Sequence, residues 1–203
     1  MDDTVFVVDD DASVRDALGL LLGLRGYRTA IFADAESFLG AWKADWRGCL
    51  LLDIRMPGMD GLSLQKHLLE IGCAIPVILI SGHGNVEAAR EAFRSAAVDF
   101  LEKPLDEQRL VTAIDEAFAL RAARDIRQQR QETASRLLTE LTPRERQVAD
   151  RAVAGRHNRE IAHELGISVR TVEVHKARVM IKLGTRNLSE LIRLMAGGVD
   201  SSG

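Results

Sequence analysis

Acidic, hydroxyl and ammonium side chains stand at the ends of several short apolar runs. Asp9 to Asp11 directly follow VFVV, Asp53 follows CLLL, Ser81 ends PVILIS and Lys103 ends VDFLEK. If these runs are parallel strands, their carboxyl ends meet at one edge of a sheet, and these side chains, with at least three carboxylates among them, would converge there. Carboxylates brought together raise each other's pKa, so a divalent cation would stabilise them. An all-oxygen set suits Mg²⁺ or Mn²⁺ better than zinc.

The same residues suit the transfer of a phosphoryl group to a carboxylate. The Asp53 carboxylate is the candidate nucleophile, the metal and Lys103 neutralise phosphoryl oxygens, and Ser81 donates a hydrogen bond to one of them. Each residue alone has a plainer explanation, because aspartates cap helices, serines end strands and lysines are common on surfaces. Their joint occurrence at the ends of four runs favours the functional interpretation.

Five alternations of an apolar run and a helical pattern must position these side chains. The runs are continuous rather than alternating, which is typical of strands covered by helices on both faces. This pattern predicts an α/β doubly wound, five-stranded parallel sheet. The strands are expected at 5–8, 27–33, 49–54, 76–81 and 98–103, and helices around 14–22, 35–44, 61–71 and 86–96 and after 104.

The overall composition conceals a division of charge. The 203 residues carry 27 Lys and Arg and 30 Asp and Glu, a net charge of −3, which excludes collagen-like, strongly disordered and polybasic classes. Residues 1–120 carry 11 basic and 20 acidic residues, or −9, whereas residues 121–203 carry 16 and 10, or +6. Two domains with different partners are expected. No disulfide framework, signal peptide or membrane-spanning run is recognised, which predicts a cytoplasmic protein.

The second half predicts a helical linker and a small all-α domain of four helices. Residues 106–138 are polar and lack Gly and Pro, and their arginines at 121, 124, 127 and 130 favour a solvated face over a nucleic-acid contact. Thr142, Pro143 and Glu145 mark a helix start. Two further helices flank Gly166, the arrangement that lays its second helix in a DNA major groove, and the last helix begins near Asn187.

The first 120 residues resemble a response-regulator receiver domain, because V-V-D-D-D (7–11), L-L-D-I-R-M-P-G-M-D-G (51–61), I-S-G-H-G (80–84) and D-F-L-E-K-P (99–104) follow in that order. The resemblance implies the strand order 2-1-3-4-5. It also implies that Asp53 accepts a phosphoryl group from a sensor histidine kinase, with Lys103 and Ser81 assisting. Mg²⁺ would be held by Asp10, Asp53 and the backbone carbonyl of Arg55, with Asp9 acting through water.

The resemblance further implies a switch formed by Ser81 and Phe100, whose hydroxyl and ring move on phosphorylation, and a cis Lys103–Pro104 bond. A phenylalanine at position 100 has no hydroxyl with which to form a hydrogen bond, so control of its rotamer would depend on packing. Family analogy also implies that the face built from the fourth helix and fifth strand forms a homodimer.

The second half resembles the LuxR-type helix-turn-helix of NarL/FixJ response regulators, through L-T-P-R-E-R, N-R-E-I-A, T-V-E-V-H and V-M-x-K-L. The whole chain is therefore identified as FixJ-like. His157 stands where the family usually has serine, so Asn158 is expected to cap the second helix. Glu173 has two open interpretations, an acceptor for a cytosine amino group or a solvated or intrahelical partner. The resemblance implies that Glu173, Val174 and Ala177 face the base edges of DNA. It implies that Asn158 also binds DNA and that five further residues lie near its phosphates: Arg170, Thr171, Lys176, Arg178 and Lys182. His175 is expected in the core.

These features predict a phosphorylation-responsive, DNA-binding transcription regulator with a receiver (1–120), a helical linker (121–138) and a DNA-binding domain (139–203). It is not expected to be an enzyme beyond its own phosphotransfer and dephosphorylation. The expected partners are a sensor histidine kinase, promoter DNA and a second copy on phosphorylation, with RNA polymerase a further candidate and no membrane. A phosphohydrolase is disfavoured because Asp53 lacks a second aspartate two residues later. A phosphorylation-independent regulator, with the receiver as an interaction module, is the alternative.

Overall fold

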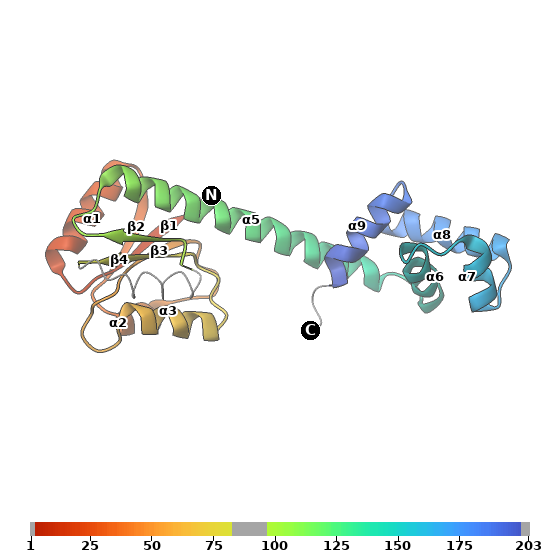
Figure 1. Ribbon diagram of the computed structural model, residues 1–203, viewed down its shortest axis with the longest axis horizontal. Helices are drawn as coiled ribbons and strands as arrows, with labels where there is room; N and C mark the ends of the chain where they lie inside the picture. The colour runs from red at the N-terminus through yellow and green to blue at the C-terminus, as the bar shows by residue number, and fades with distance from the viewer. Residues whose placement is uncertain (1–2, 83–96, 200–203) are drawn as a thin grey trace. The chain divides into compact units, whose positions relative to one another are not determined.

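The computed structural model describes residues 3–82 and 97–199 (Figure 1). Its internal contacts divide the chain into two compact units, Met1–Arg124 and Asp125–Gly203, and each is described by itself. The helix predicted near 86–96 and residues 83–84 of the I-S-G-H-G motif lie outside the described residues. In the described ranges, no helix is both long enough and apolar enough to cross a membrane.

A five-stranded parallel sheet forms the centre of the first unit, in the predicted order β2-β1-β3-β4-β5. The residue pairs Val8 with Leu52 and Ser81 with Glu102 stand side by side where neighbouring strands end. The side chains that end or directly follow these strands therefore share one sheet edge. The strands are β1 (Thr4–Val8), β2 (Arg28–Phe32), β3 (Gly48–Asp53), β4 (Val77–Ser81) and β5 (Asp99–Glu102).

Helices cover both faces of the sheet, as the continuous apolar runs predicted. Helices α2 (Ala35–Ala41) and α3 (Gly61–Glu70) lie on one face, and α1 (Ala12–Leu24) and the first part of α5 (Glu107–Thr139) lie on the other (Figure 1). Aspartates cap α1, α2 and α3 by accepting backbone N–H bonds. Helix α2 ends at Ala41, three residues before the predicted limit.

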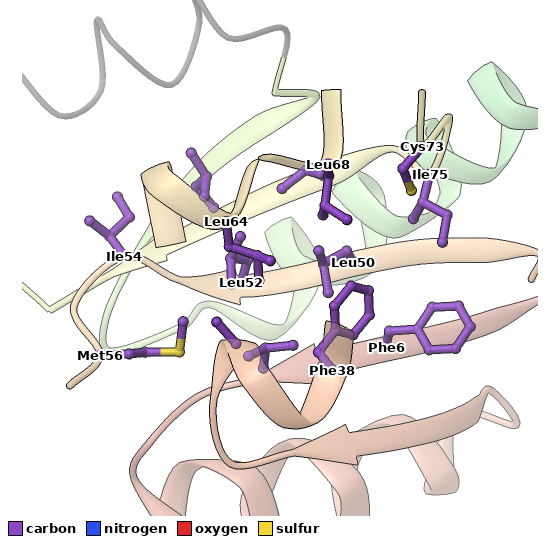
Figure 2. Close-up of a cluster of buried hydrophobic side chains, with 14 residues drawn as sticks. Phe6, Phe38, Leu50, Leu52, Ile54, Met56, Leu64, Leu68, Cys73 and Ile75 are labelled. Carbon is purple, nitrogen blue, oxygen red and sulfur yellow. The ribbon is translucent and has the colours of Figure 1, made fainter. Parts of the chain in front are cut away.

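Successive residues of the central strands pack into two different cores. Phe6, Leu50 and Leu52 belong to the cluster beneath α2 and α3, which Figure 2 shows around Phe38. The intervening residues, such as Leu51, belong to the cluster beneath α1 and α5. Because side chains alternate across a strand, a strand buried on both faces has no polar position. The strands that end at the candidate site residues are therefore packed between two cores.

Among the arginines of the predicted solvated face of α5, Arg124 is exposed as predicted, whereas Arg121 is half-buried. Arg121 donates through Nη1 to the carbonyl oxygen of Trp46 at 3.0 Å, and Arg124 donates to the carbonyl oxygen of Ala74 at 3.3 Å. Both acceptors lie in loops that precede strands of the sheet. These arginines therefore hold α5 against the first unit.

The second unit contains the four predicted helices beyond α5. Thr142 and Glu145 form the expected capping box at the start of α6, and Gly166, with φ of 64°, permits the tight turn between α7 and α8. The helix-turn-helix segment is therefore present. The helices are α6 (Pro143–Val153), α7 (Asn158–Leu165), α8 (Val169–Leu183) and α9 (Leu188–Val199).

The expected cap of α7 is wrong. His157 occupies the N-cap position, and Asn158 is the first helical residue. The backbone N–H of His157 donates to the Glu160 carboxylate at 2.7 Å, so this glutamate satisfies an amide at the helix start. The Asn158 side chain is thereby available for a contact with α8.

Candidate functional site

Two buried carboxylates share one ammonium group at the carboxyl edge of the sheet. Lys103 Nζ lies 2.7 Å from Asp9 Oδ2 and 2.8 Å from Asp53 Oδ1. Asp9 is 1% exposed and Asp53 4%. The remaining oxygens accept backbone N–H bonds, Asp9 Oδ1 from Asp11 at 2.9 Å and Asp53 Oδ2 from Arg55 at 2.8 Å. The predicted acids and lysine are therefore brought together, with both carboxylates fixed in orientation.

The charges in this cluster are not balanced. Burial raises the pKa of Asp53, the hydrogen bond and charge of Lys103 oppose that rise, and the nearby charge of Asp9 adds to it. Burial alone would lower the pKa of Lys103, but hydrogen bonds to both carboxylates outweigh it and raise that pKa. One ammonium thus serves two carboxylates, which leaves the site attractive to a further cation.

The predicted convergence of three carboxylates is not found. Among the residues that the structure describes, no three His, Cys, Asp or Glu side chains are grouped to hold a metal ion. Asp10 is exposed beside the buried pair. Mg²⁺ in proteins commonly keeps several waters and takes only one or two carboxylates. The oxygen donors present therefore fit this ion without a third carboxylate in the group.

Ser81 and Lys103 stand on neighbouring strand ends, as expected. Ser81 is buried, and its backbone oxygen accepts from the backbone N–H of Lys103 at 2.8 Å. Phe100 is half-buried and packs against the core beneath α2 and α3. The Lys103–Pro104 bond is cis, which confirms that expectation.

Two residues that the sequence reasoning missed hold the backbone of the site. Arg15 donates through Nη1 to the backbone oxygen of Asp9 at 2.7 Å. At Gly61, a Cβ atom would lie 2.2 Å from the backbone oxygen of Asp53, so a larger residue would displace the start of α3 or Asp53 itself. Glycine has a low helix propensity, so its presence in the first turn of α3 was the sequence signal that could have indicated a close backbone contact there.

An apolar groove of about 370 Å³ opens beside Lys103. The first turns of α1 form one wall and the residues after β5 form the other. Such concave apolar surfaces are common places for partners to bind. The groove is lined by Ser13, Val14, Ala17, Leu18, Leu21, Lys103, Pro104 and Leu105.

In the second unit, α8 separates a buried face from an exposed one. Val172, Val179 and Leu183 are buried against the other helices, and His175 is half-buried with its Nδ1 atom covered, as expected of a core histidine. The opposite face is open. It carries Arg170, Glu173, Val174, Ala177 and Arg178, all exposed, which includes the three residues expected to face bases.

Two lysines that are predicted to contact phosphates form hydrogen bonds within the second unit. Lys176 Nζ donates to Asn158 Oδ1 at 3.0 Å, which joins α8 to α7. Lys182 Nζ donates to Glu145 Oε2 at 2.7 Å and to the backbone oxygen of Glu140 at 3.1 Å. The hydrogen bond from Lys182, followed by the backbone N–H of Thr142, lowers the pKa of buried Glu145 to about 2. The contact of these lysines with DNA phosphates stays a prediction.

Two family descriptions match the chain. The response regulator receiver domain matches residues 5–115, and the bacterial regulatory proteins of the luxR family match residues 139–195. The first match covers the sheet and its acid cluster, and the second covers α6 to α8 and most of α9.

Several known proteins are similar over nearly the whole chain. The transcriptional regulatory protein FixJ of Bradyrhizobium diazoefficiens is 42% identical, over 94% of this chain and 93% of its own. FixJ of Rhizobium meliloti is 43% identical over 99% of both chains. The low-resolution structure of the response regulator StyR aligns with a TM-score of 0.83 and 41% identity, over 97% of this chain and 99% of that chain.

Proposed function

Because the chain belongs to the NarL/FixJ family of response regulators, we propose that a sensor histidine kinase phosphorylates it on Asp53 and thereby controls its binding to promoter DNA. Members of this family are transcription regulators rather than classical enzymes. The proposal assigns phosphate acceptance to residues 1–120, linkage to residues 121–138, which fall within helix α5, and DNA binding to residues 139–203.

The observation that carries the proposal is the ammonium shared by Asp9 and Asp53. In the transfer, an oxygen of Asp53 attacks the phosphorus of a phosphohistidine, the P–N bond breaks and an acyl phosphate forms. Lys103 lies close enough to Asp53 to bind a phosphoryl oxygen on the product, since 2.8 Å separates the two groups. The Ser81 hydroxyl, at the end of the adjacent strand, is the second donor to that phosphoryl group.

The oxygen donors at this edge fit Mg²⁺ or Mn²⁺. Asp10, Asp53 and the backbone carbonyl of Arg55 would hold the ion, with Asp9 acting through water. When bound, the ion neutralises charge on the phosphoryl oxygens. The backbone N–H of Arg55 keeps one Asp53 oxygen oriented, and Arg15 keeps the backbone of Asp9 in place.

The kinase is proposed to dock on the groove beside Lys103. A donor that delivers a phosphoryl group to Asp53 must approach the carboxyl edge of the sheet, and this groove is the apolar surface that includes Lys103 itself. Val14, Ala17 and Leu21 supply the apolar contacts. Substitution of Ala17 by a bulky residue is therefore expected to slow transfer from the kinase but not from a small phosphodonor.

Phosphorylation is proposed to act through Ser81 and Phe100. The new phosphoryl oxygens draw the Ser81 hydroxyl toward them, and the partly buried Phe100 ring repacks inward. Two copies then associate and present two α8 helices to half-sites about one DNA turn apart. RNA polymerase is a further candidate partner at the promoter.

Phosphorylation with acetyl phosphate and Mg²⁺, read by intact mass, tests the assignment of Asp53. The wild-type chain is expected to gain one phosphoryl group and Asp53→Asn none, whereas the control Asp60→Asn, at an exposed helix cap, behaves as wild type. A phosphorylated Asp53→Asn chain would refute the assignment. Equal DNA affinity with and without the phosphoryl group would favour the phosphorylation-independent alternative.

A further inference from the structure

The helices α6 to α9 carry six carboxylates, and five of them have partners. Glu173 is the exception. Its side chain is exposed and forms no hydrogen bond or ion pair with any residue that the structure describes. The partnered carboxylates are Glu145 with Lys182, Asp150 with Arg146, Glu160 with the backbone of His157, Glu164 with Arg151 and Glu190 with the backbone of Arg186.

An internal partner for Glu173 is available but unused. Arg170 lies three residues earlier on the same helix, a spacing at which oppositely charged side chains meet. No ion pair joins these two residues in the described part of the chain. The structure therefore lacks the intrahelical pair, and Glu173 is exposed to solvent in the free chain, where its carboxylate is available to accept from DNA.

The position of Glu173 makes an unpaired carboxylate costly. It lies on the open face of α8, beside the apolar Val174 and Ala177 and between two exposed arginines, Arg170 and Arg178. Those arginines are suited to DNA phosphates. A carboxylate brought into the same groove is repelled by the phosphates and loses its hydration water. This free-energy cost is offset only where the DNA supplies a hydrogen-bond donor to the carboxylate.

We propose that Glu173 selects a cytosine by accepting a hydrogen bond from its N4 amino group in the major groove. The inference rests on the proposed binding of DNA through α8. Among the four bases, cytosine presents a donor and no acceptor of its own on that edge. Adenine adds the N7 acceptor beside its amino group, guanine presents N7 and O6, and thymine presents O4. An acceptor-only carboxylate is therefore matched best by cytosine, because each of the other bases presents an acceptor on that edge.

Selection from a random DNA duplex library by the full chain, with acetyl phosphate and Mg²⁺ present, tests this assignment. Wild type, Glu173→Ala, Glu173→Gln and Glu140→Gln are compared. Glu140 is the matched control, because its side chain is also exposed and has no partner among the described residues, and it lies outside α8. Either substitution removes one negative charge from the chain, so Glu140→Gln reports how a loss of charge outside α8 affects binding.

Wild type and Glu140→Gln are expected to select cytosine at one position of each half-site. At that position, another base is expected to weaken binding by about 5- to 100-fold. Glu173→Ala is expected to lose that preference alone, while the other selected positions persist. Glu173→Gln is expected to shift it to adenine, since a glutamine amide both donates and accepts.

The inference would be overturned if Glu173→Ala retained the cytosine preference. It would also be overturned if Glu173→Ala, like Glu140→Gln, only raised the affinity for all sequences to the same degree. These results leave the proposed function intact, because wild type still selects a sequence. If wild type selects no sequence in either phosphorylation state, the proposed DNA binding fails and the cytosine assignment fails with it.

Discussion

Replacement of Lys103 by methionine is expected to destabilise the first unit strongly at neutral pH. The substitution keeps most of the aliphatic chain but removes the ammonium that lies 2.7 Å from Asp9 and 2.8 Å from Asp53. Both carboxylates then remain buried without a cation. Breaking a buried ion pair from one side costs about 3–5 kcal/mol, and the 24% exposure of Lys103 admits water that reduces this to about 2–3 kcal/mol.

The loss of stability in Lys103→Met is expected to be smaller at low pH than at neutral pH. Without the ammonium, the pKa of Asp53 rises further, since burial already raises it in the wild-type chain. A carboxyl whose pKa is raised in the folded state stabilises that state below its unfolded pKa, near 4, and loses this effect as pH rises through the folded value. The difference between Lys103→Met and wild type should therefore shrink on acidification from pH 7 toward pH 4.

Urea unfolding followed by tryptophan fluorescence measures this loss in the full chain. Both tryptophans, Trp42 and Trp46, lie in the first unit, so the signal reports that unit alone. Lys66→Met is the control, because Lys66 is exposed on α3. Asp53→Asn added to Lys103→Met should restore part of the stability, since it removes one of the two buried carboxylates and leaves Asp9. If Lys103→Met is as stable as Lys66→Met at pH 7, the shared ammonium does not hold the cluster together.

Three further perturbations follow from individual contacts. Glu145→Gln should lower the stability of the second unit by about 1–2 kcal/mol near pH 7. The pKa of Glu145 is lowered to about 2, so the stability difference between variant and wild type should be constant above pH 5 and should shrink as pH falls from about 4.5 to 2, as followed by circular dichroism. Gly61→Ala should destabilise the first unit by more than about 2 kcal/mol, since its Cβ would lie 2.2 Å from the backbone oxygen of Asp53, whereas Gly40→Ala, with no neighbour within 4 Å, should stabilise α2 by up to about 1 kcal/mol in the same urea assay. Burial raises the pKa of the Cys49 thiol, so iodoacetamide should label it at pH 8 only after urea unfolds the chain, and labelling of the folded chain would contradict its burial.

The elements of both units were predictable because their signals are local. Continuous apolar runs predicted the sheet buried on both faces, and the helix-start pattern at Thr142 and Glu145 predicted a capping box that the structure contains. The strand order and the cis peptide bond came from the family resemblance and are confirmed. The placement of acids and a lysine at strand ends predicted their meeting, because parallel strands share an edge.

The partners of long side chains were not predictable, because they depend on packing between segments far apart in sequence. Lys182 meets Glu145 across 37 residues, and Arg121 meets the backbone of Trp46 across 75. The sequence analysis assigned Lys182 to a DNA contact and Arg121 to a solvated face. The cap of α7 was missed for a different reason. His157 is not a usual N-cap residue, although Glu160, three residues later, accepts from its backbone N–H as the glutamate of a capping box does.

The ratio of carboxylates to cationic side chains within each cluster distinguishes the proposed binding surfaces of this chain from its structural ion pairs. Lys103 serves two carboxylates, so that cluster carries excess negative charge at the edge of the acidic half, where a divalent ion and a phosphoryl group are proposed to bind. Lys182 serves the single carboxylate of Glu145, which balances it and makes the pair a structural link. Arg170 and Arg178 have no carboxylate partner in the described residues, so their charge is available to DNA. The division of charge between the two halves of the sequence therefore has its counterpart in individual contacts, with excess acid at the proposed phosphoacceptor Asp53 and excess base on the exposed face of α8.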